Sequence, residues 1–259
     1  SEPRKVQIDL VKDKNVSDSR IMPLSGGARN ISVSPDGKEV AMTVRGEVLV
    51  CGVDFNSTSR VTETSGQERT VSFGKDGKVL FYDSERNGVW SIYKATPRDK
   101  DAKCFSLARG FNEELFTAPG QTCFQPSVSP DGKMVAYLKD RNDLAVKPVS
   151  GGQEKVLLKG VNFSYSDGDI NFAWSPDSRF ILSLYQGGGR MYNEDIALVN
   201  VETGAVIDLT ESGYSDGTFH WALGGKAMTW VSDKAGYRSH GSWGAEGDVY
   251  IMFFDDKAY

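Results

Sequence analysis

The sequence predicts an all-β protein that repeats one antiparallel unit along its length. The heptapeptide SVSPDGK occurs at Ser32–Lys38 and, letter for letter, at Ser127–Lys133. Residues of alternating polarity precede and follow each copy, which is the pattern of a strand with one buried face. No stretch of any length shows the 3.6-residue periodicity of a helix. The repeated unit is therefore expected to be a strand, a tight turn and a second strand.

The Pro-Asp-Gly centre of the heptapeptide is typical of a tight turn. Proline sets φ near −65°, aspartate bonds its own backbone, and glycine adopts positive φ without strain. Related turns follow at spacings of 40, 55, 46 and 47 residues, counted between Asp36, Asp76, Asp131, Asp177 and Gly224. A period of roughly 40 to 50 residues with four strands is the signature of a β-propeller blade.

Further alternating segments supply the remaining strands of each blade. The repeats span approximately residues 29–65, 69–118, 125–160, 171–212 and 219–259, and residues 1–28 are expected to hold N-terminal strands. In repeat one, for example, the third and fourth strands are expected at 47–53 and 57–62. A solenoid or a sandwich is the alternative, but a sandwich would not need the same turn five times.

The second repeat contains a long polar segment between Lys94 and Phe124. This segment accounts for the 55-residue spacing between its turn and the next. We expect its outer strand near Lys103–Leu107, and mobility in the rest of the connection.

The two ends of the repeat series do not match. Repeat five has three expected strands, the third at Asp248–Phe254, before the sequence stops at Tyr259. Arg20–Leu24 precedes repeat one and resembles an unassigned outer strand. That strand could complete the last blade and close a ring, since closure removes exposed sheet edges. Alternatively, the five blades belong to a larger ring.

Composition excludes several classes of function. The net charge of −5 and the pI near 5.2 argue against nucleic acid and anionic membranes as partners, because both are polyanions. No apolar run approaches the roughly 18 residues needed to span a bilayer. Cys51, Cys104 and Cys123 lack CxxC spacing, and there are two histidines, so we expect simple thiols, no metal site and no cofactor. The opening SEPRKVQIDL lacks a Met and an apolar signal core, so a piece of a longer protein is expected.

The SPDGK turns resemble the repeats of TolB-like and tricorn-type propellers. Longer phrases, among them ISVSPDGKEVAMTVRGEVLV, NFSYSDGD, LTESGYSDG and GGKAMTWVSDKAGYRSHGSWG, resemble the second propeller of bacterial tricorn-like serine peptidases. That resemblance covers nearly the whole chain, from about Lys5 to Tyr259. It implies a seven-bladed ring whose channel admits peptides, followed in the parent chain by PDZ-like and catalytic domains. The catalytic segments of that family have no counterpart in this sequence. The resemblance also implies export to the periplasm, as is frequent in bacterial relatives, whereas archaeal relatives are cytoplasmic.

Two serine motifs invite a catalytic interpretation. Gly213–Gly217 matches G-x-S-x-G, but a nucleophile elbow requires a helix after the serine, and here a strand is expected at Thr218–Leu223. Ser239 and His240 are adjacent in sequence, whereas triad members are assembled in space. We expect a turn between blades at the first motif and no catalysis at the second.

Clustered carboxylates raise two further possibilities. Ser166–Asp169 places two carboxylates around a glycine, which suits either a hard cation or a turn capped by aspartate, and the turn is the simpler interpretation. Some five-bladed propellers are glycosidases with carboxylates around the axis. Such a role would fall to Asp167, Asp169, Glu194 and Asp216.

Long loops between the second and third strands of repeats four and five are the best binding candidates. They contain 186–193 and 237–244, are rich in glycine, and lie on the same face of the expected disc. Trp243 could equally pack against a neighbouring blade. We expect peptide-binding residues among Tyr165, Asp167, Asp169, Arg190, Tyr192, Asn193, Arg238, His240 and Trp243. By contrast, Trp90, Trp174, Trp221 and Trp230 fall at strand positions and are expected to be blade core.

These observations favour a non-catalytic propeller segment that guides or filters peptides toward catalytic domains elsewhere in a tricorn-like parent. A free-standing TolB-like module that binds a protein is the main alternative, and a glycosidase is the weaker one. An open arc of five blades would also expose two sheet faces, so self-association of the chain is expected.

Overall fold

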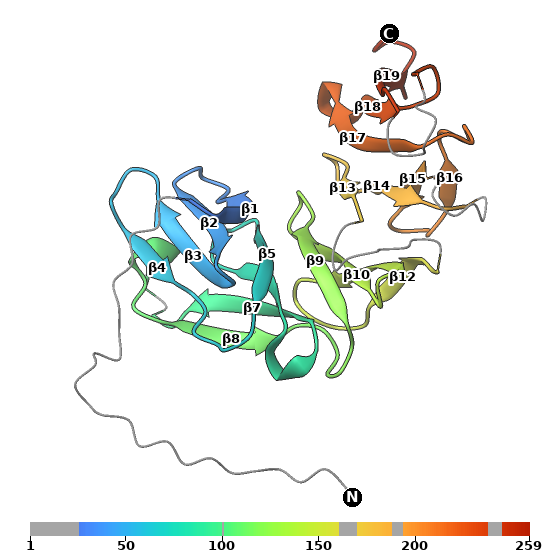
Figure 1. Ribbon diagram of the computed structural model, residues 1–259. Coiled ribbons are helices and arrows are strands. Elements are labelled where there is room, and N and C mark those ends of the chain that lie inside the picture. Colours follow the sequence, from blue (N-terminus) through green and yellow to red (C-terminus); the bar gives the residue numbers. More distant parts are fainter. Residues whose placement is uncertain (1–25, 100, 161–169, 188–193, 238–244) are drawn as a thin grey trace, which may run out of the picture.

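The computed structural model of the chain describes residues 26–99, 101–160, 170–187, 194–237 and 245–259. These residues form five antiparallel sheets arranged in an open arc (Figure 1). Four sheets have four strands and the last has three, and each sheet contains strands that are consecutive in the sequence. The predicted all-β propeller of about five blades is confirmed.

The strands of each blade run in order from the centre of the arc to its outside. Blade 1 contains β1 (Ala28–Val33), β2 (Glu39–Val44), β3 (Glu47–Gly52) and β4 (Thr58–Arg60). Blade 2 contains β5 (Glu68–Phe73), β6 (Leu80–Ser84), β7 (Ser91–Pro97) and β8 (Phe111–Leu115). Blade 3 contains β9 (Cys123–Val128), β10 (Met134–Lys139), β11 (Asp143–Pro148) and β12 (Lys155–Leu158). Blade 4 contains β13 (Phe172–Trp174), β14 (Phe180–Tyr185), β15 (Asp195–Asn200) and β16 (Val206–Asp208), and blade 5 contains β17 (Asp216–Ala222), β18 (Ala227–Ser232) and β19 (Asp248–Phe253).

The helical content of the described residues is limited to three short 3-10 helices. These are η1 (Arg86–Gly88), η2 (Phe105–Leu107) and η3 (Leu223–Gly225). None of them is long and apolar enough to cross a membrane.

The repeated heptapeptide folds into one hydrogen-bonded turn. Asp36 Oδ1 accepts from the Ser34 hydroxyl at 2.7 Å and from the Lys38 N–H at 3.1 Å, while the Ser34 oxygen accepts from the Glu39 N–H at 2.9 Å. The same set of bonds recurs at Ser129–Met134 and at Ser175–Phe180. The serine and aspartate thus satisfy the backbone groups that the turn leaves unpaired, which explains why these letters repeat.

Neighbouring blades share hydrophobic cores. Val71 and Phe73 on β5 face blade 1 and pack with Ala41, Val48 and Val50. Similar clusters join blades 2 and 3, blades 3 and 4, and blades 4 and 5. First strands are also linked by hydrogen bonds at equivalent positions: Phe73 N–H to Ser32 Oγ (3.1 Å), Val128 N–H to Ser72 Oγ (3.1 Å), Trp174 Nε1 to Ser127 O (3.0 Å) and Trp221 Nε1 to Ala173 O (3.1 Å). Each blade therefore depends on its neighbours for burial.

The long connection in blade 2 differs from the prediction. The expected outer strand near Lys103–Leu107 is wrong, because Phe105–Leu107 form η2 and the outer strand is β8. The connection crosses back to blade 1, where Glu39 Oε2 and Oε1 accept from the Phe105 and Ser106 N–H groups at 3.1 and 2.6 Å. Phe105 is fully buried in the core of blades 1 and 2. We call residues 98–99 and 101–110 the strap.

Both ends of the arc carry apolar faces that no blade formed by the described residues covers. Ile31 and Val33 on β1 are 64% and 57% exposed, although their counterparts Val71 and Phe73 are buried. At the other end, Val249 and Ile251 on β19 are 74% and 49% exposed. Blades 1 and 5 stand apart in Figure 1, so the described residues do not close a ring. The suggested closing strand at Arg20–Leu24 lies outside the described residues.

Because Phe105 of the strap lies in the core shared by blades 1 and 2, its removal is expected to destabilise both blades. Phe105→Ala removes a buried ring from the shared core and should lower the free energy of unfolding by about 3–5 kcal/mol. Leu107→Ala, in the same turn but 61% exposed, is the control and should change stability by less than about 1 kcal/mol. Urea unfolding measures both, and equal effects of the two variants would show that the strap does not stabilise blade 1.

The turn aspartates predict a stability change in acid. The hydrogen bond from the Ser34 hydroxyl and that from the Lys38 N–H lower the pKa of Asp36 below its usual 3.8. The folded state therefore binds fewer protons than the unfolded chain, so this stabilisation is complete above about pH 4 and is lost as the pH falls through the lowered pKa. Asp36→Asn should melt below the wild type at pH 7, and the difference in Tm should shrink below pH 4. A difference independent of pH would contradict this.

The uncovered end faces predict concentration-dependent self-association. Burial of exposed apolar area favours association, so the purified chain should form dimers or larger species in sedimentation velocity. Val33→Glu or Ile251→Glu should weaken this, whereas Ile207→Glu, on the outer strand of blade 4, should not. A complex with a Kd of about 100 μM or less is populated when the chain is at about 100 μM. A chain that remains monomeric at every concentration up to that value would overturn the prediction.

Candidate functional site

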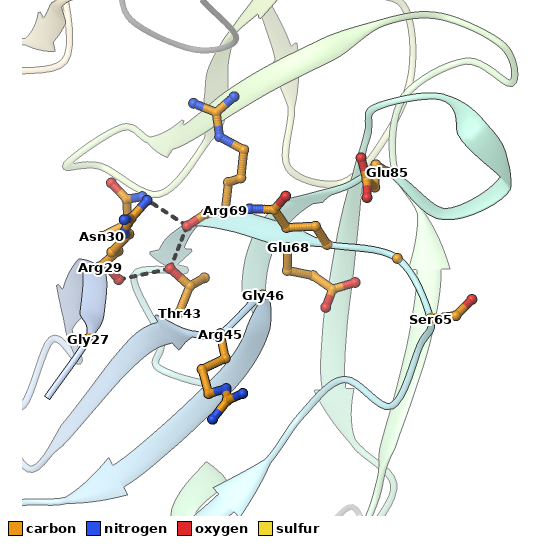
Figure 2. A pocket seen from close by; sticks show the side chains of 12 residues that line it. Gly27, Arg29, Asn30, Thr43, Arg45, Gly46, Ser65, Glu68, Arg69 and Glu85 are labelled. Atoms are coloured by element: carbon orange, nitrogen blue, oxygen red, sulfur yellow. Dashed lines mark hydrogen bonds between the residues drawn. The ribbon is translucent and has the colours of Figure 1, made fainter. Parts of the chain in front are cut away.

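A hollow of about 610 Å³ opens where blades 1 and 2 meet (Figure 2). It lies at the end of the blades where β1 and β5 begin, beside the turn between β2 and β3 and the linker between the blades. Its charged and polar lining includes Arg29, Asn30, Arg45, Glu68, Arg69 and Glu85. We call this hollow the basic mouth, because its lining contains three arginines and two glutamates.

One threonine sets the spacing of the mouth. The Thr43 hydroxyl lies 2.9 Å from the Arg29 carbonyl oxygen and 2.7 Å from the Arg69 carbonyl oxygen, so it bridges β1 and β5 (Figure 2). The Asn30 side-chain amide also donates to the Arg69 carbonyl at 3.0 Å. Asn30 has φ of 48° at an irregularity in the β1–β2 register. This irregularity has the form of a β-bulge, and β5 carries one at the equivalent place, between Glu68 and Val71.

Glu68 forms the floor of the mouth and is not available to solvent. Its Oε1 accepts from the Thr64 hydroxyl at 2.9 Å and from the Ser84 hydroxyl at 2.8 Å, and Arg86 Nη2 lies 3.7 Å away. Burial raises the pKa of this carboxyl despite these hydrogen bonds. The second oxygen, Oε2, is buried without a hydrogen-bond partner. Glu68 therefore has a structural role.

The Arg69 side chain is held by an aromatic ring. Its guanidinium lies 5.4 Å from the centre of the Trp90 ring, within the range of a cation–π contact. The Trp90 ring in turn packs against Phe124 of blade 3. Within the part of the chain that the structure describes, neither Arg29 nor Arg69 has a carboxylate partner within salt-bridge distance. The mouth can thus attract an anion, and the hydroxyl side chains in its lining are those of Thr43 and Ser65.

The serine motif at Gly213–Gly217 runs from a bend between blades 4 and 5 into β17. Asp216 begins β17, so a strand follows the serine where an elbow would need a helix. The Ser215 N–H donates to Asp233 Oδ1 at 3.0 Å. Asp216 itself is buried and accepts from Ser212 Oγ and Trp230 Nε1, at 2.6 and 3.2 Å. A carboxylate enclosed in this way is poorly placed to act on a glycan.

All nine binding residues expected from the sequence lie outside the described residues, and so does the Ser239–His240 pair. These residues are Tyr165, Asp167, Asp169, Arg190, Tyr192, Asn193, Arg238, His240 and Trp243. Their segments begin and end at described residues on the side of the blades where β15 starts and β18 ends. The basic mouth opens on that same side, because the β2–β3 turn is the equivalent connection in blade 1.

Trp174, Trp221 and Trp230 lie in strands, as expected, whereas Trp90 immediately precedes β7. Trp174 is buried in the core between blades 3 and 4, while Trp221 and Trp230 pack against the core between blades 4 and 5. Trp90 packs against a cluster that includes Phe124. The three cysteines are free thiols, and burial raises the pKa of Cys123 to about 12. Among the described residues, no group of three or more potential ligands is placed to hold a metal ion.

Sequence reasoning missed the arginines of the mouth. Arg29 and Arg69 stand at equivalent positions, four residues before the end of β1 and β5. Aligning the two repeats would have revealed the coincidence. Only the structure shows that Thr43 brings the two positions together.

Comparisons with known proteins identify the fold. No protein family and no curated protein matches the sequence. Among solved structures, a putative TolB from Agrobacterium tumefaciens is similar with a TM-score of 0.60 and 20% identity over 87% of this chain and 76% of its own. The tricorn protease is similar with a TM-score of 0.64 and 18% identity over 87% of this chain and 21% of its own. Hydrazine synthase of Kuenenia stuttgartiensis is similar with a TM-score of 0.61 and 14% identity over 93% of this chain and 66% of its own.

These similarities establish a propeller fold of the TolB and tricorn type. At 20% identity or less they carry no information on activity, since one fold serves many functions.

Proposed function

We propose that the chain is a non-catalytic β-propeller segment that binds peptide or protein chains and, in a tricorn-like serine peptidase, guides them toward catalytic domains. The observation that carries this proposal is the basic mouth, an open polar hollow beside the centre of the arc. A hollow with convergent polar groups on a rigid scaffold is the usual form of a binding site. The chain as a whole has a net charge of −5, whereas the mouth contains three arginines. Anions are therefore attracted to this place and not to the surface in general.

The resemblance of the long sequence phrases to tricorn-like peptidases supports the proposed parent. The chain spans 21% of the tricorn protease, so the catalytic and PDZ-like partners belong to the proposal. Export to the periplasm is part of the same proposal and rests on the resemblance alone. A cytoplasmic location is its alternative.

A TolB-like module that binds a protein partner is the second candidate. The chain matches 76% of the putative TolB, a larger share than of the tricorn protease. Sequencing the gene beyond Tyr259 separates the two candidates. An open reading frame that encodes a PDZ-like domain favours the peptidase, and a stop codon favours the module.

The proposal predicts binding without turnover. The purified chain should bind fluorescein-labelled peptides in anisotropy titrations and should leave a fluorogenic peptide library intact. Ser215→Ala should change neither result, because Ser215 lies in a turn before a strand. Hydrolysis by the wild type that disappears in Ser215→Ala would refute the non-catalytic role, and a chain that binds no peptide would refute the binding role.

A further inference from the structure

We propose that the two ends of the arc are complementary, so that blade 1 of one copy of the chain packs against blade 5 of a second copy as neighbouring blades pack within the chain. The two blades stand at opposite ends of the arc in Figure 1. This inference goes beyond the peptide-binding role and does not depend on it. It also goes further than self-association as such, because it states which surface meets which.

Blade 1 has on its outer face the residues that a later blade buries against the blade before it. Three residues before the central Asp or Gly of its turn, each later blade has an apolar side chain in or against the core shared with the preceding blade, and these side chains are Phe73, Val128, Trp174 and Trp221. In blade 1 this position is Val33, which is exposed. Ile31 lies on the same strand, and Val40 pairs with Val33 across the sheet. We call this face, formed by Ile31, Val33 and Val40, the tail.

Blade 5 has on its outer face the residues that an earlier blade buries under the blade after it. In blades 1–4 one position of the third strand is fully buried, and it is occupied by Val48, Ile92, Leu144 and Ile196. In blade 5 the same position is Val249, which is 74% exposed. Val249 pairs with Val231, and Ile251 pairs with Thr229, so these four side chains share one face of the sheet. We call this face the head.

The junctions within the chain all have the same direction. The Phe73 N–H donates to the Ser32 hydroxyl of the preceding blade at 3.1 Å, and the other three junctions have a bond between the same two positions. At the ends of the arc the donor position is Val33 in the tail, and the acceptor position is His220, an exposed residue of β17 beside the head. Two tails would bring together two donor positions, whereas a tail on a head supplies one donor and one acceptor.

A second copy of the chain is the occupant that fits both ends. Its blade 5 presents the face that blade 1 lacks, and its blade 1 presents the face that blade 5 lacks. Such a contact is heterologous, because a copy whose tail is covered still has a free head. Copies therefore add in a row unless the row closes into a ring.

The experiment blocks one end at a time and then mixes the two variants. Val33→Glu places a charge in the tail, and Ile251→Glu places one in the head. Each variant alone should associate at least about tenfold more weakly than the wild type in sedimentation velocity, because a charge is costly to bury in an apolar contact. An equimolar mixture should form a 1:1 dimer and nothing larger, since it contains one intact head and one intact tail.

Further variants control for the fold and for the place of the contact. Ile207→Glu, on the outer strand of blade 4, should associate like the wild type, because its side chain is exposed and belongs to neither end. Thermal melting of each variant verifies that the fold is retained. Ile31→Lys and Val249→Lys block the same two ends at more exposed positions, and they replace any Glu variant that melts early.

Every other result contradicts the proposal. If one of the two variants dimerises by itself, the contact joins like ends. If both variants associate like the wild type, the contact lies elsewhere on the chain. A mixture that stays monomeric, or a wild type that is monomeric up to about 100 μM, would also overturn the pairing of head and tail. None of these results touches the proposed peptide binding, which is measured separately by anisotropy.

Discussion

Burial of sheet faces between blades is the constraint on which the whole molecule depends. A four-stranded antiparallel sheet with two apolar faces cannot be stable alone in water, because each face must be covered. In this chain Val71 and Phe73 of one blade are buried by Ala41, Val48 and Val50 of the preceding one, and the arrangement recurs along the arc. The first strands add a hydrogen bond at each junction. Where the neighbour is missing, as at Ile31 and Val33, the same positions are exposed.

The basic mouth forms at one of these junctions, where the packing of blade 1 against blade 2 brings its lining residues together. Because β1 and β5 must pack together, residues at their starts are brought close, and the Asn30 amide donates directly to the Arg69 carbonyl. Thr43 then fixes that approach with one hydroxyl. In the next blade the equivalent position is Asp83, which is fully buried and accepts from the Thr70 N–H and from the Gln125 N–H of blade 3. Burial raises the pKa of Asp83, which suits a structural carboxyl rather than a binding one.

The sequence was sufficient for the blades and insufficient for the site, for a physical reason. Turn chemistry and the alternation of polar and apolar residues are local, so Ser34 and Asp36 predict a turn from residues within five positions of each other. Contacts between blades join residues about 40 positions apart, and no local sequence pattern predicts which residues meet. The strap shows this plainly, since residues 103–107 look like a strand in isolation but cross to Glu39 of another blade. The mouth could not be predicted for the same reason, and the expected loop residues remain predictions because they lie outside the described part of the chain.

The strap also has a bearing on how the chain acquires its structure during synthesis. Phe105 fills the core of a blade whose own strands end at Arg60, so that core is incomplete until some 45 further residues have left the ribosome. The nascent first blade must therefore wait for its neighbour. Blades 1 and 2 would form as one cooperative nucleus, onto which the later blades add in turn.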